Sequence, residues 1–287
     1  MKVLVSGCMG FIGSNLVQRL QKQGHEVEGI SRKSVYPNYK VYFLDLCSNH
    51  VAEKVRAENF DAIIHLAGET NEKDLPSMFN ANVVTTLNIL DFAKERNIKK
   101  FIFVSGHNVY APSKILPIKE NFPTIPFTNY GCSKLLSENL VSYYSSNFDL
   151  YTTVLRVSVT YGTGYPKKNT IGKIIESYKN SEPISLHKYK NGFQKVDLIN
   201  VYDVCDAIIK ALVSTKKYAV YNIASGKPET IKDIIRVLEN NIKSDSKITE
   251  TDIERNAIHF YYDIKAARKD LDFEPKISLE EGLASLL

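Results

Sequence analysis

The first two-thirds of the chain alternate short apolar runs, rich in β-branched residues, with segments of helical periodicity. Residues 11–23 place Ile12, Leu16 and Leu20 on one face of a helix, which Gly24 ends. Because strands that alternate with helices pair in parallel, the pattern predicts a parallel sheet covered by helices on both faces. The predicted strands are 2–6, 27–31, 41–44, 62–66, 101–105 and 152–157, and further helices are predicted near 48–58, 77–96 and 129–147.

After Gly162 the pattern becomes mixed. Helical periodicity recurs, but apolar runs of strand length are too few for a second sheet of the same kind. This part is predicted to form a smaller lobe that closes over the carboxyl ends of the first sheet, where such sheets bind ligands. Its predicted helices are 171–179, 201–214, 231–240, 264–271 and 279–286, with short strands near 184–186 and 219–223.

Composition narrows the class of protein. Hydrophobic residues make up 44% of the 287 and charged residues 24%, which is ordinary for a soluble globular protein. No stretch approaches the roughly 20 apolar residues of a membrane span. The first strand begins at Lys2 and leaves no room for a signal peptide, so we expect a cytoplasmic protein. The four cysteines are scattered without metal-ligand spacing, so we expect reduced thiols and no metal site.

The formal net charge of +5 suits anionic ligands but selects none of them. The lysine pairs are isolated along the chain, as on a solvated surface, so no nucleic-acid partner is expected.

A glycine-rich turn follows the first predicted strand. Gly7 permits a tight turn, Gly10 lets backbone amides approach a pyrophosphate, and Gly13 lets the next helix pack close to the sheet. The helix N-terminus favours the negative charge of phosphates. A glycine triplet alone also fits a plain turn, but this one lies between a strand and an amphipathic helix. It therefore predicts a dinucleotide site on a Rossmann-type, doubly wound parallel sheet with a smaller mixed α/β substrate lobe.

The end of the second strand bears on the choice of dinucleotide. NAD-preferring sites of this type place an acidic residue there to bind the adenosine ribose. This chain has Ser31 and Arg32, followed by Lys33, which suit the 2′-phosphate of NADP, although a solvated basic turn would look the same. We predict NADP, with NADPH favoured over NADH.

Tyr130 and Lys134 are four residues apart at the start of a predicted helix. This spacing places both side chains on one face, one turn apart. A nearby ammonium stabilises tyrosinate, so we expect Lys134 to lower the pKa of Tyr130 and make the phenol a proton donor or acceptor. The pair alone is common by chance, but behind the glycine turn it indicates catalysis.

With these motifs, the chain resembles the extended short-chain dehydrogenase/reductases over nearly its full length. They are the NAD(P)-dependent nucleotide-sugar epimerase/dehydratase/reductase family. The segments that carry the resemblance are 7–13, 61–68, 82–83, 87–88, 103–105, 109–110, 117–120, 130–134, 155–156, 161–162, 203–204, 221–226, 262–266, 275 and 279–283.

The resemblance implies roles for matching positions. Tyr130 would move a proton to or from the sugar oxygen, and Lys134 would also bind the nicotinamide ribose. The substrate would be a nucleotide-diphosphate sugar, and two copies would pair through helices near 77–96 and 129–147. The other cofactor-binding positions would be Gly7, Gly10, Phe11, Ile12 and Gly13 at the pyrophosphate, Asp45 and Leu46 at the adenine, and Leu66, Ala67 and Gly68 along the dinucleotide.

The same resemblance divides the chain. Residues 1–162 would form the dinucleotide-binding domain, with 197–218 packing back on it. Residues 163–196 and 219–287 would form the substrate-binding lobe.

The reacting site departs from the family pattern. Gly106 stands where the family has a Ser or Thr hydroxyl, and we expect that a shift of the loop by one residue would bring Ser105 into that catalytic role. His107 and Asn108 replace the Asp-Glu pair of the dehydratases and are expected to contact the substrate instead. Because Asn cannot exchange protons, a dehydratase is disfavoured.

Substrate binding departs as well. Val159 stands where the epimerases place an Asn that contacts the substrate, and Val196 replaces a diphosphate-binding Arg. Lys195, with Lys188 and Lys190 nearby, would bind the diphosphate. Alternatively, these lysines are solvated residues of a surface loop.

These features together favour NADPH-dependent reduction of a nucleotide-linked keto-sugar, of the 4-keto-6-deoxy type, in carbohydrate biosynthesis. One alternative is an NAD(P)-dependent nucleotide-sugar 4-epimerase or C4 dehydrogenase. Another is a non-catalytic NADP(H)-binding regulatory or scaffold protein, since Gly106, Val159 and Val196 are what the decay of a catalytic site would leave. The intact Tyr130 and Lys134 favour an enzyme.

Overall fold

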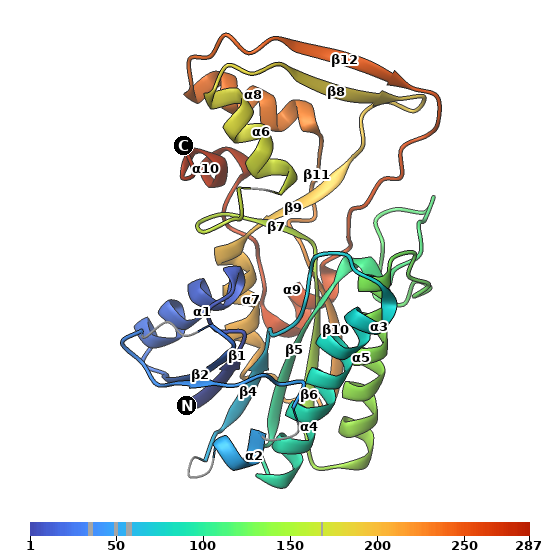
Figure 1. Ribbon diagram of the computed structural model, residues 1–287. Coiled ribbons are helices and arrows are strands. Elements are labelled where there is room, and N and C mark those ends of the chain that lie inside the picture. The colour runs from blue at the N-terminus through green and yellow to red at the C-terminus, as the bar shows by residue number, and fades with distance from the viewer. Residues whose placement is uncertain (34–36, 49–50, 56–58, 168) are drawn as a thin grey trace.

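The fold is a parallel sheet between layers of helices, with a smaller lobe above its carboxyl edge (Figure 1). The computed structural model describes residues 1–33, 37–48, 51–55, 59–167 and 169–287. Within these residues seven strands form one sheet in the order β10-β6-β5-β4-β1-β2-β3. Every neighbouring pair in it is parallel. The strands are β1 (Lys2–Ser6), β2 (Glu26–Ser31), β3 (Val41–Phe43), β4 (Ala62–His65), β5 (Lys100–Gly106), β6 (Tyr151–Val157) and β10 (Tyr218–Ile223).

The strand order reverses between β1 and β4. From β1 the chain proceeds outward through β2 and β3, then returns to β4 on the other side of β1 and continues through β5 and β6. The connections on the two sides of this point diverge, which leaves a crevice at the carboxyl ends of β1 and β4. The glycine turn follows β1, and Leu66–Gly68 follow β4.

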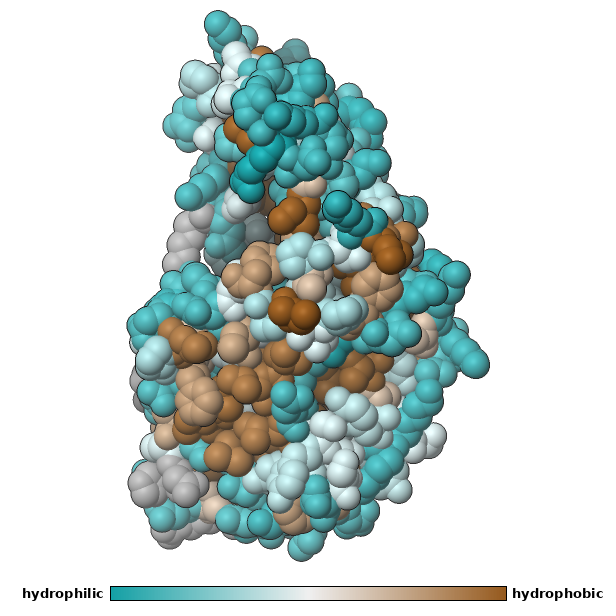
Figure 2. All heavy atoms as spheres, turned by 90° about the vertical axis from the view of Figure 1, so that its right-hand side faces the viewer, coloured by the Kyte–Doolittle hydropathy of each residue, from teal (hydrophilic) through white to brown (hydrophobic). Residues whose placement is uncertain are grey.

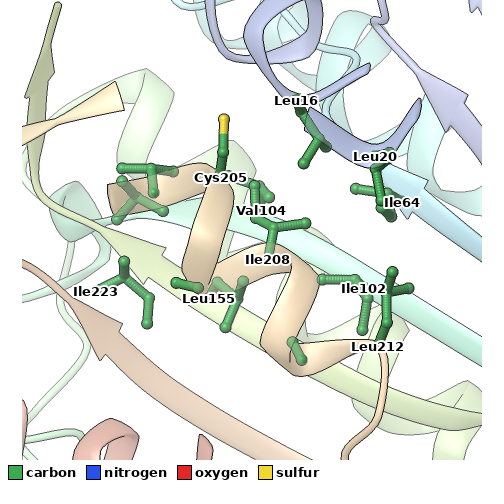
Figure 3. Close-up of a cluster of buried hydrophobic side chains, with 14 of the residues drawn as sticks. Leu16, Leu20, Ile64, Ile102, Val104, Leu155, Cys205, Ile208, Leu212 and Ile223 are labelled. Atoms are coloured by element: carbon green, nitrogen blue, oxygen red, sulfur yellow. The ribbon is translucent and has the colours of Figure 1, made fainter. Parts of the chain in front are cut away.

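Both faces of the sheet are buried, which explains the near-continuous apolar strands. Successive side chains of a strand point to opposite faces. On β5, Ile102 and Val104 accordingly join the core under α1 (Phe11–Lys22) and α7 (Val201–Ala211) (Figure 3). Phe101 and Phe103 join a second core on the other face, under α4 (Thr85–Glu95) and α5 (Asn129–Asn147).

The helix expected near 77–96 is three consecutive helical segments. They are α3 (Leu75–Met78), the π-helical turn η1 (Phe79–Val84) and α4. A π-turn inserts an extra residue into a helix and is found mostly at functional sites. Here it turns Asn82 inward, where its side chain bonds to Ser133 of α5 at 2.8 Å and to the backbone of Glu69. The helix expected over 48–58 is described only as α2 (Val51–Lys54), because 49–50 and 56–58 lie outside the described residues.

The smaller lobe has its own core. Apolar faces of α6 (Thr170–Lys179), α8 (Ile231–Asn241) and α10 (Leu279–Ala284) pack there with residues of short strands. The strands are β7 (Val159–Tyr161), β9 (Val196–Asn200) and β11 (Pro228–Glu229) in one sheet, and β8 (Ile184–Tyr189) with β12 (Ile248–Ile253) in another. Of these, only β8 was anticipated from the sequence.

Residues 219–223, which were expected in the smaller lobe, belong instead to β10. This strand pairs with β6 along its full length and forms the edge of the large sheet. The helix α9 (Lys265–Leu271) places Ala267 and Leu271 in the core on the α1 side of that sheet. The sequence does not reveal this, because the apolar residues of β10 are buried beside β6, a parallel neighbour far away in the chain. Residues 197–218 divide similarly, with β9 in the smaller lobe and α7 against α1.

No helix in the described ranges is both long and apolar enough to span a membrane. The described His, Cys, Asp and Glu residues form no group of three or more that could hold a metal ion.

Candidate active site

Two adjoining cavities follow the carboxyl edge of the large sheet. They share Gly7, Gly10, Leu66 and Gly68, which lie where the strand order reverses. One cavity extends along β2 and β3. The other, of about 900 Å³, extends over β5 and α5 to the smaller lobe. Together they form one trough that extends from the end of β2 to the smaller lobe.

The centre of the trough is a backbone cradle that only glycines permit. Gly7 has φ +71°, and a Cβ there would lie 2.7 Å from the backbone nitrogen of Ala67. A Cβ at Gly13 would lie 2.2 Å from the Gly7 carbonyl oxygen, so α1 packs directly on the turn. Gly10 caps α1 without a side chain, which leaves the first N–H groups of the helix for a ligand. Phe11, Ile12 and Gly13 line the larger cavity there, so the cradle fits a dinucleotide pyrophosphate.

The lining of the smaller cavity has the chemistry of an adenosine site. Its lining includes an apolar wall for a base and a basic turn after β2. Among the residues expected at the cofactor, Ser31, Arg32, Asp45, Leu46, Leu66, Ala67 and Gly68 all line it.

The nearest carboxylate on β2 is engaged elsewhere. Glu28 is buried, 3.1 Å from Lys2 Nζ, and accepts a hydrogen bond from Tyr42 at 2.8 Å. The Ser31 hydroxyl oxygen accepts the Lys33 N–H at 3.0 Å, which closes the turn and brings Arg32 and Lys33 to the cavity. The end of β2 therefore presents two cations to a ribose.

Tyr130 and Lys134 lie in the larger cavity, on the first turns of α5. Thr128 caps this helix by accepting the Gly131 N–H at 2.9 Å. The Lys134 side chain crosses to β5, where its Nζ donates to the Val104 carbonyl oxygen at 2.7 Å and lies 4.2 Å from the centre of the Phe103 ring. The strand thus fixes the ammonium beneath the cavity.

Burial acts on both groups. It raises the pKa of Tyr130 to about 12 and lowers the pKa of Lys134 to about 7, because a desolvated charge is costly. The expectation that Lys134 lowers the pKa of Tyr130 is therefore wrong for the protein alone, where desolvation is the dominant effect.

Gly106 is the last residue of β5, and its Cα faces the tyrosine. A Cβ there would lie 3.4 Å from Tyr130 Oη, so a Ser or Thr at 106 would carry its hydroxyl next to the phenol. Ser105 also lines the cavity but is 3% exposed, and its Oγ finds no hydrogen-bond partner in the described chain. The loop has not shifted, since Gly106 keeps its register with Val157. Ser105 is thus not hydrogen-bonded to Tyr130.

His107 and Asn108 follow in the short 3₁₀ turn η2 (His107–Val109), and both line the larger cavity. The His107 ring stands edge-on to Phe260 and Tyr262, and its Nδ1 is buried without a partner among the described residues. Burial lowers the pKa of His107 to about 4, so the imidazole is neutral near pH 7.

The smaller lobe contributes residues that sequence reasoning missed. The N-terminus of α6 faces the cavity, which Asn169, Thr170 and Lys173 line. A helix N-terminus next to a cation suits a second phosphate group. The amphipathic pattern predicted this helix but could not show which way its end points.

The lysines of the basic loop expected to bind a diphosphate lie outside the lining of the two cavities. Lys195 is absent from the lining of both cavities. Lys188 pairs with Glu250 at 3.5 Å and Lys190 with Glu254 at 3.1 Å, along the β8–β12 ribbon. The placement of Lys195 at the substrate stays a prediction. Lys195 precedes β9, and its carbonyl oxygen accepts the N–H of Phe260, whose ring stands edge-on to His107.

Comparison with known proteins agrees with this geometry. The model of the family described as "NAD dependent epimerase/dehydratase family" matches residues 3–224. UDP-glucuronate 4-epimerase of Thermodesulfobacterium geofontis is 28% identical, over 98% of this chain and 93% of that protein.

Solved structures show the same fold. UDP-glucose 4-epimerase of Thermotoga maritima, solved with UDP-glucose, superposes with a TM-score of 0.89 at 24% identity, over 99% of this chain and 97% of that one. UDP-glucuronic acid 4-epimerase from Bacillus cereus, solved with UDP-glucuronic acid and NAD, superposes with a TM-score of 0.85 at 25% identity and the same coverage.

Proposed function

The chain belongs to the NAD-dependent epimerase/dehydratase family, and we propose that it is a nucleotide-sugar 4-epimerase. The observation that carries the proposal is the continuity of the trough. It joins the glycine cradle, Tyr130 and the N-terminus of α6 in one space. A dinucleotide on the cradle and a nucleotide-diphosphate sugar at α6 would meet beside Tyr130.

The epimerase replaces reduction as the leading interpretation. Reduction was favoured because β2 ends without an acidic residue, but that feature concerns which dinucleotide binds and not whether it is consumed. The relatives and structures named above are 4-epimerases of UDP-sugars, which supports the alternative.

In this mechanism Tyr130 would take the proton of the sugar hydroxyl at C4, and a bound dinucleotide would supply a reversible acceptor for the C4 hydride. Tyr130 gives the proton back to the oxygen, so the cycle has no net redox change. Lys134, held by the Val104 carbonyl, would bind the ribose and, when protonated, place its charge near the phenol. The positive charge of an oxidised nicotinamide would lower the high pKa of Tyr130 toward the working range.

For the cofactor we propose NADP over NAD. The support is the paired cations Arg32 and Lys33 in the adenosine cavity and the engagement of Glu28 by Lys2 and Tyr42. Arg binds phosphate through two parallel N–H donors, so Arg32 would hold the 2′-phosphate. Because an epimerase keeps its dinucleotide through the cycle, this choice is compatible with either reaction.

We also propose a homodimer formed through α4 and α5. Figure 2 shows a wide apolar area on the lower part of the face where α3, α4 and α5 lie. Leu75, Phe79 and Leu136 come from these elements and are between 37% and 42% exposed. Large exposed apolar areas of this kind mark protein interfaces.

The test begins with the purified protein and a panel of UDP-glucose, UDP-galactose, UDP-N-acetylglucosamine and UDP-glucuronate. We expect conversion of one of them to its 4-epimer without added dinucleotide. Denaturing the protein should release NADP. Turnover that instead requires added NADPH, with 4-keto-6-deoxy sugars and loss of reduced-nicotinamide absorbance, would establish the reductase.

Replacement of Tyr130 distinguishes an enzyme from a non-catalytic binding protein. Tyr130→Phe should lower kcat by at least about 10³-fold and leave dinucleotide affinity unchanged, since only the proton-transferring oxygen is lost. Tyr143→Phe is the matched control, because Tyr143 lies on the same helix but is 56% exposed. Equal turnover in both variants contradicts the mechanism.

A further inference from the structure

The space next to the tyrosine hydroxyl is flanked by a second polar group. A Cβ on Gly106 would lie 3.4 Å from Tyr130 Oη and 3.6 Å from Asn108 Oδ1. Both atoms thus face the point from which the family's hydroxyl residue would act. The Asn108 carboxamide lines the cavity, and no hydrogen bond ties it to the rest of the described chain.

Asn108 is held rigidly relative to Tyr130. The turn η2 is closed by the Tyr110 N–H, which donates to the His107 carbonyl oxygen at 3.2 Å. The first turn of α5 then packs on Asn108 itself, since a Cβ at Gly131 would lie 2.2 Å from its carbonyl oxygen. Gly131 adjoins Tyr130, so this contact holds the backbone of Asn108 next to the start of the helix that carries Tyr130.

The neighbouring polar residues are less well placed. Side-chain alternation along β5 directs Ser105 to the face opposite that of Gly106, and its Oγ is sealed from solvent. The His107 Nδ1 is also sealed, with the ring against Phe260 and Tyr262. Asn108 Oδ1, by contrast, lies 3.6 Å from the position of a Cβ on Gly106.

We propose that Asn108 is a catalytic residue whose amide replaces the missing hydroxyl, by donating a hydrogen bond to the sugar oxygen that exchanges its proton with Tyr130. The inference rests on the proposed function and deepens it. The carboxamide can turn about its Cβ–Cγ bond, so its NH₂ can occupy the position of Oδ1. It keeps both protons throughout and stabilises the negative charge that develops on the oxygen when the hydride moves. Tyr130 remains the group that gives and takes the proton.

Four variants of the full-length protein with its dinucleotide test this role. Asn108→Ala should lower kcat by about 10²-fold with little change in KM, which is the usual effect of losing one such donor. Asn108→Asp has the same shape but no donor at neutral pH, and should lose a similar factor. Gly106→Ser combined with Asn108→Ala should recover at least about 10-fold, since Gly106 lies at φ −133°, which any residue adopts, and has room for a side chain. Asn121→Ala, at an exposed position, is the control.

The outcomes separate a catalytic role from a structural one. Wild-type kcat in Asn108→Ala, or no recovery in the double variant, overturns the proposal, because a role in packing η2 would not be rescued by a hydroxyl at 106. If the UDP-sugars give no turnover but keto-sugars with NADPH do, the proposed 4-epimerase function is contradicted. The role of Asn108 is then tested by comparing kcat of each variant with that of the wild type in the reduction. If the wild type turns over neither the UDP-sugars nor the keto-sugars, both the epimerase activity and the role of Asn108 are contradicted.

Discussion

Among single residues, Lys134 is a cation held where its charge is costly. It is 7% exposed, and its Nζ has one carbonyl and one aromatic ring as neighbours. Burial lowers the pKa of Lys134 to about 7, with Glu138 acting weakly in the other direction. The site thus accepts a loss of folding stability to keep a titratable ammonium at the base of the cavity.

This burial predicts a pH-dependent stability. Below pH 7 Lys134 is charged in both states, and between pH 7 and 10.5 only the unfolded chain holds its proton. The free energy of unfolding of the wild type, relative to Lys134→Met, should therefore rise with pH across this window. We expect a rise of about 2–5 kcal/mol, measured by urea unfolding at several pH values.

The exposed Lys22, replaced in the same way, is the control and should show no such trend. A difference between wild type and Lys134→Met that does not depend on pH would show that the ammonium is not desolvated.

At the scale of elements, α6 illustrates how a helix acquires a function from its orientation. Its apolar face belongs to the core of the smaller lobe, with Ile171 and Ile175 buried. That packing points the helix N-terminus at the cavity and places Lys173 on its lining. The helix dipole and the ammonium act in the same direction on a phosphate.

Reversing the charge at this end should weaken substrate binding selectively. Lys173→Glu is expected to raise KM for the UDP-sugar about 10-fold, as for the loss of a charged phosphate contact, and to leave dinucleotide affinity unchanged. The measurement is steady-state kinetics beside titration of the dinucleotide.

Lys179→Glu, at the other end of the same helix near the Leu286 and Leu287 carbonyls, should keep the wild-type KM. Equal effects at the two ends would mean that only the overall charge matters.

For the whole molecule, the two faces of the large sheet differ in what covers them. The α1 and α7 face is closed by α9 and by the chain leading to the smaller lobe. The α4 and α5 face leaves apolar side chains in contact with solvent, as Figure 2 shows. A second copy of the chain is the partner that we propose for this face.

Sedimentation tests the dimer. The wild type should sediment as a dimer, and Leu136→Glu combined with Phe79→Glu should sediment as a monomer with an unchanged circular dichroism spectrum, because buried unpaired charges disfavour association. Val213→Glu is the control, since Val213 is 75% exposed after α7, on the other face of the sheet. A wild-type monomer would exclude this interface.

Local features determined what could be foreseen from the sequence. The glycine turn, the alternation of strand and helix, and the four-residue spacing of Tyr130 and Lys134 each depend on neighbours within a few residues. They predicted the sheet, the glycine turn at its carboxyl edge and the position of Tyr130 and Lys134 on one helix face, and the resemblance of the whole chain predicted the family. The strands of the large sheet fall within a residue or two of their expected ends for the same reason.

Tertiary structure alone decided which distant segments meet. The place of β10 in the large sheet and the direction of α6 depend on contacts between residues far apart in the chain. So does the position of Asn108, which faces Tyr130 only because α5 packs on η2 through Gly131. Periodicity shows which face of an element is apolar, but not which partner buries it, and the partner determines where each end points.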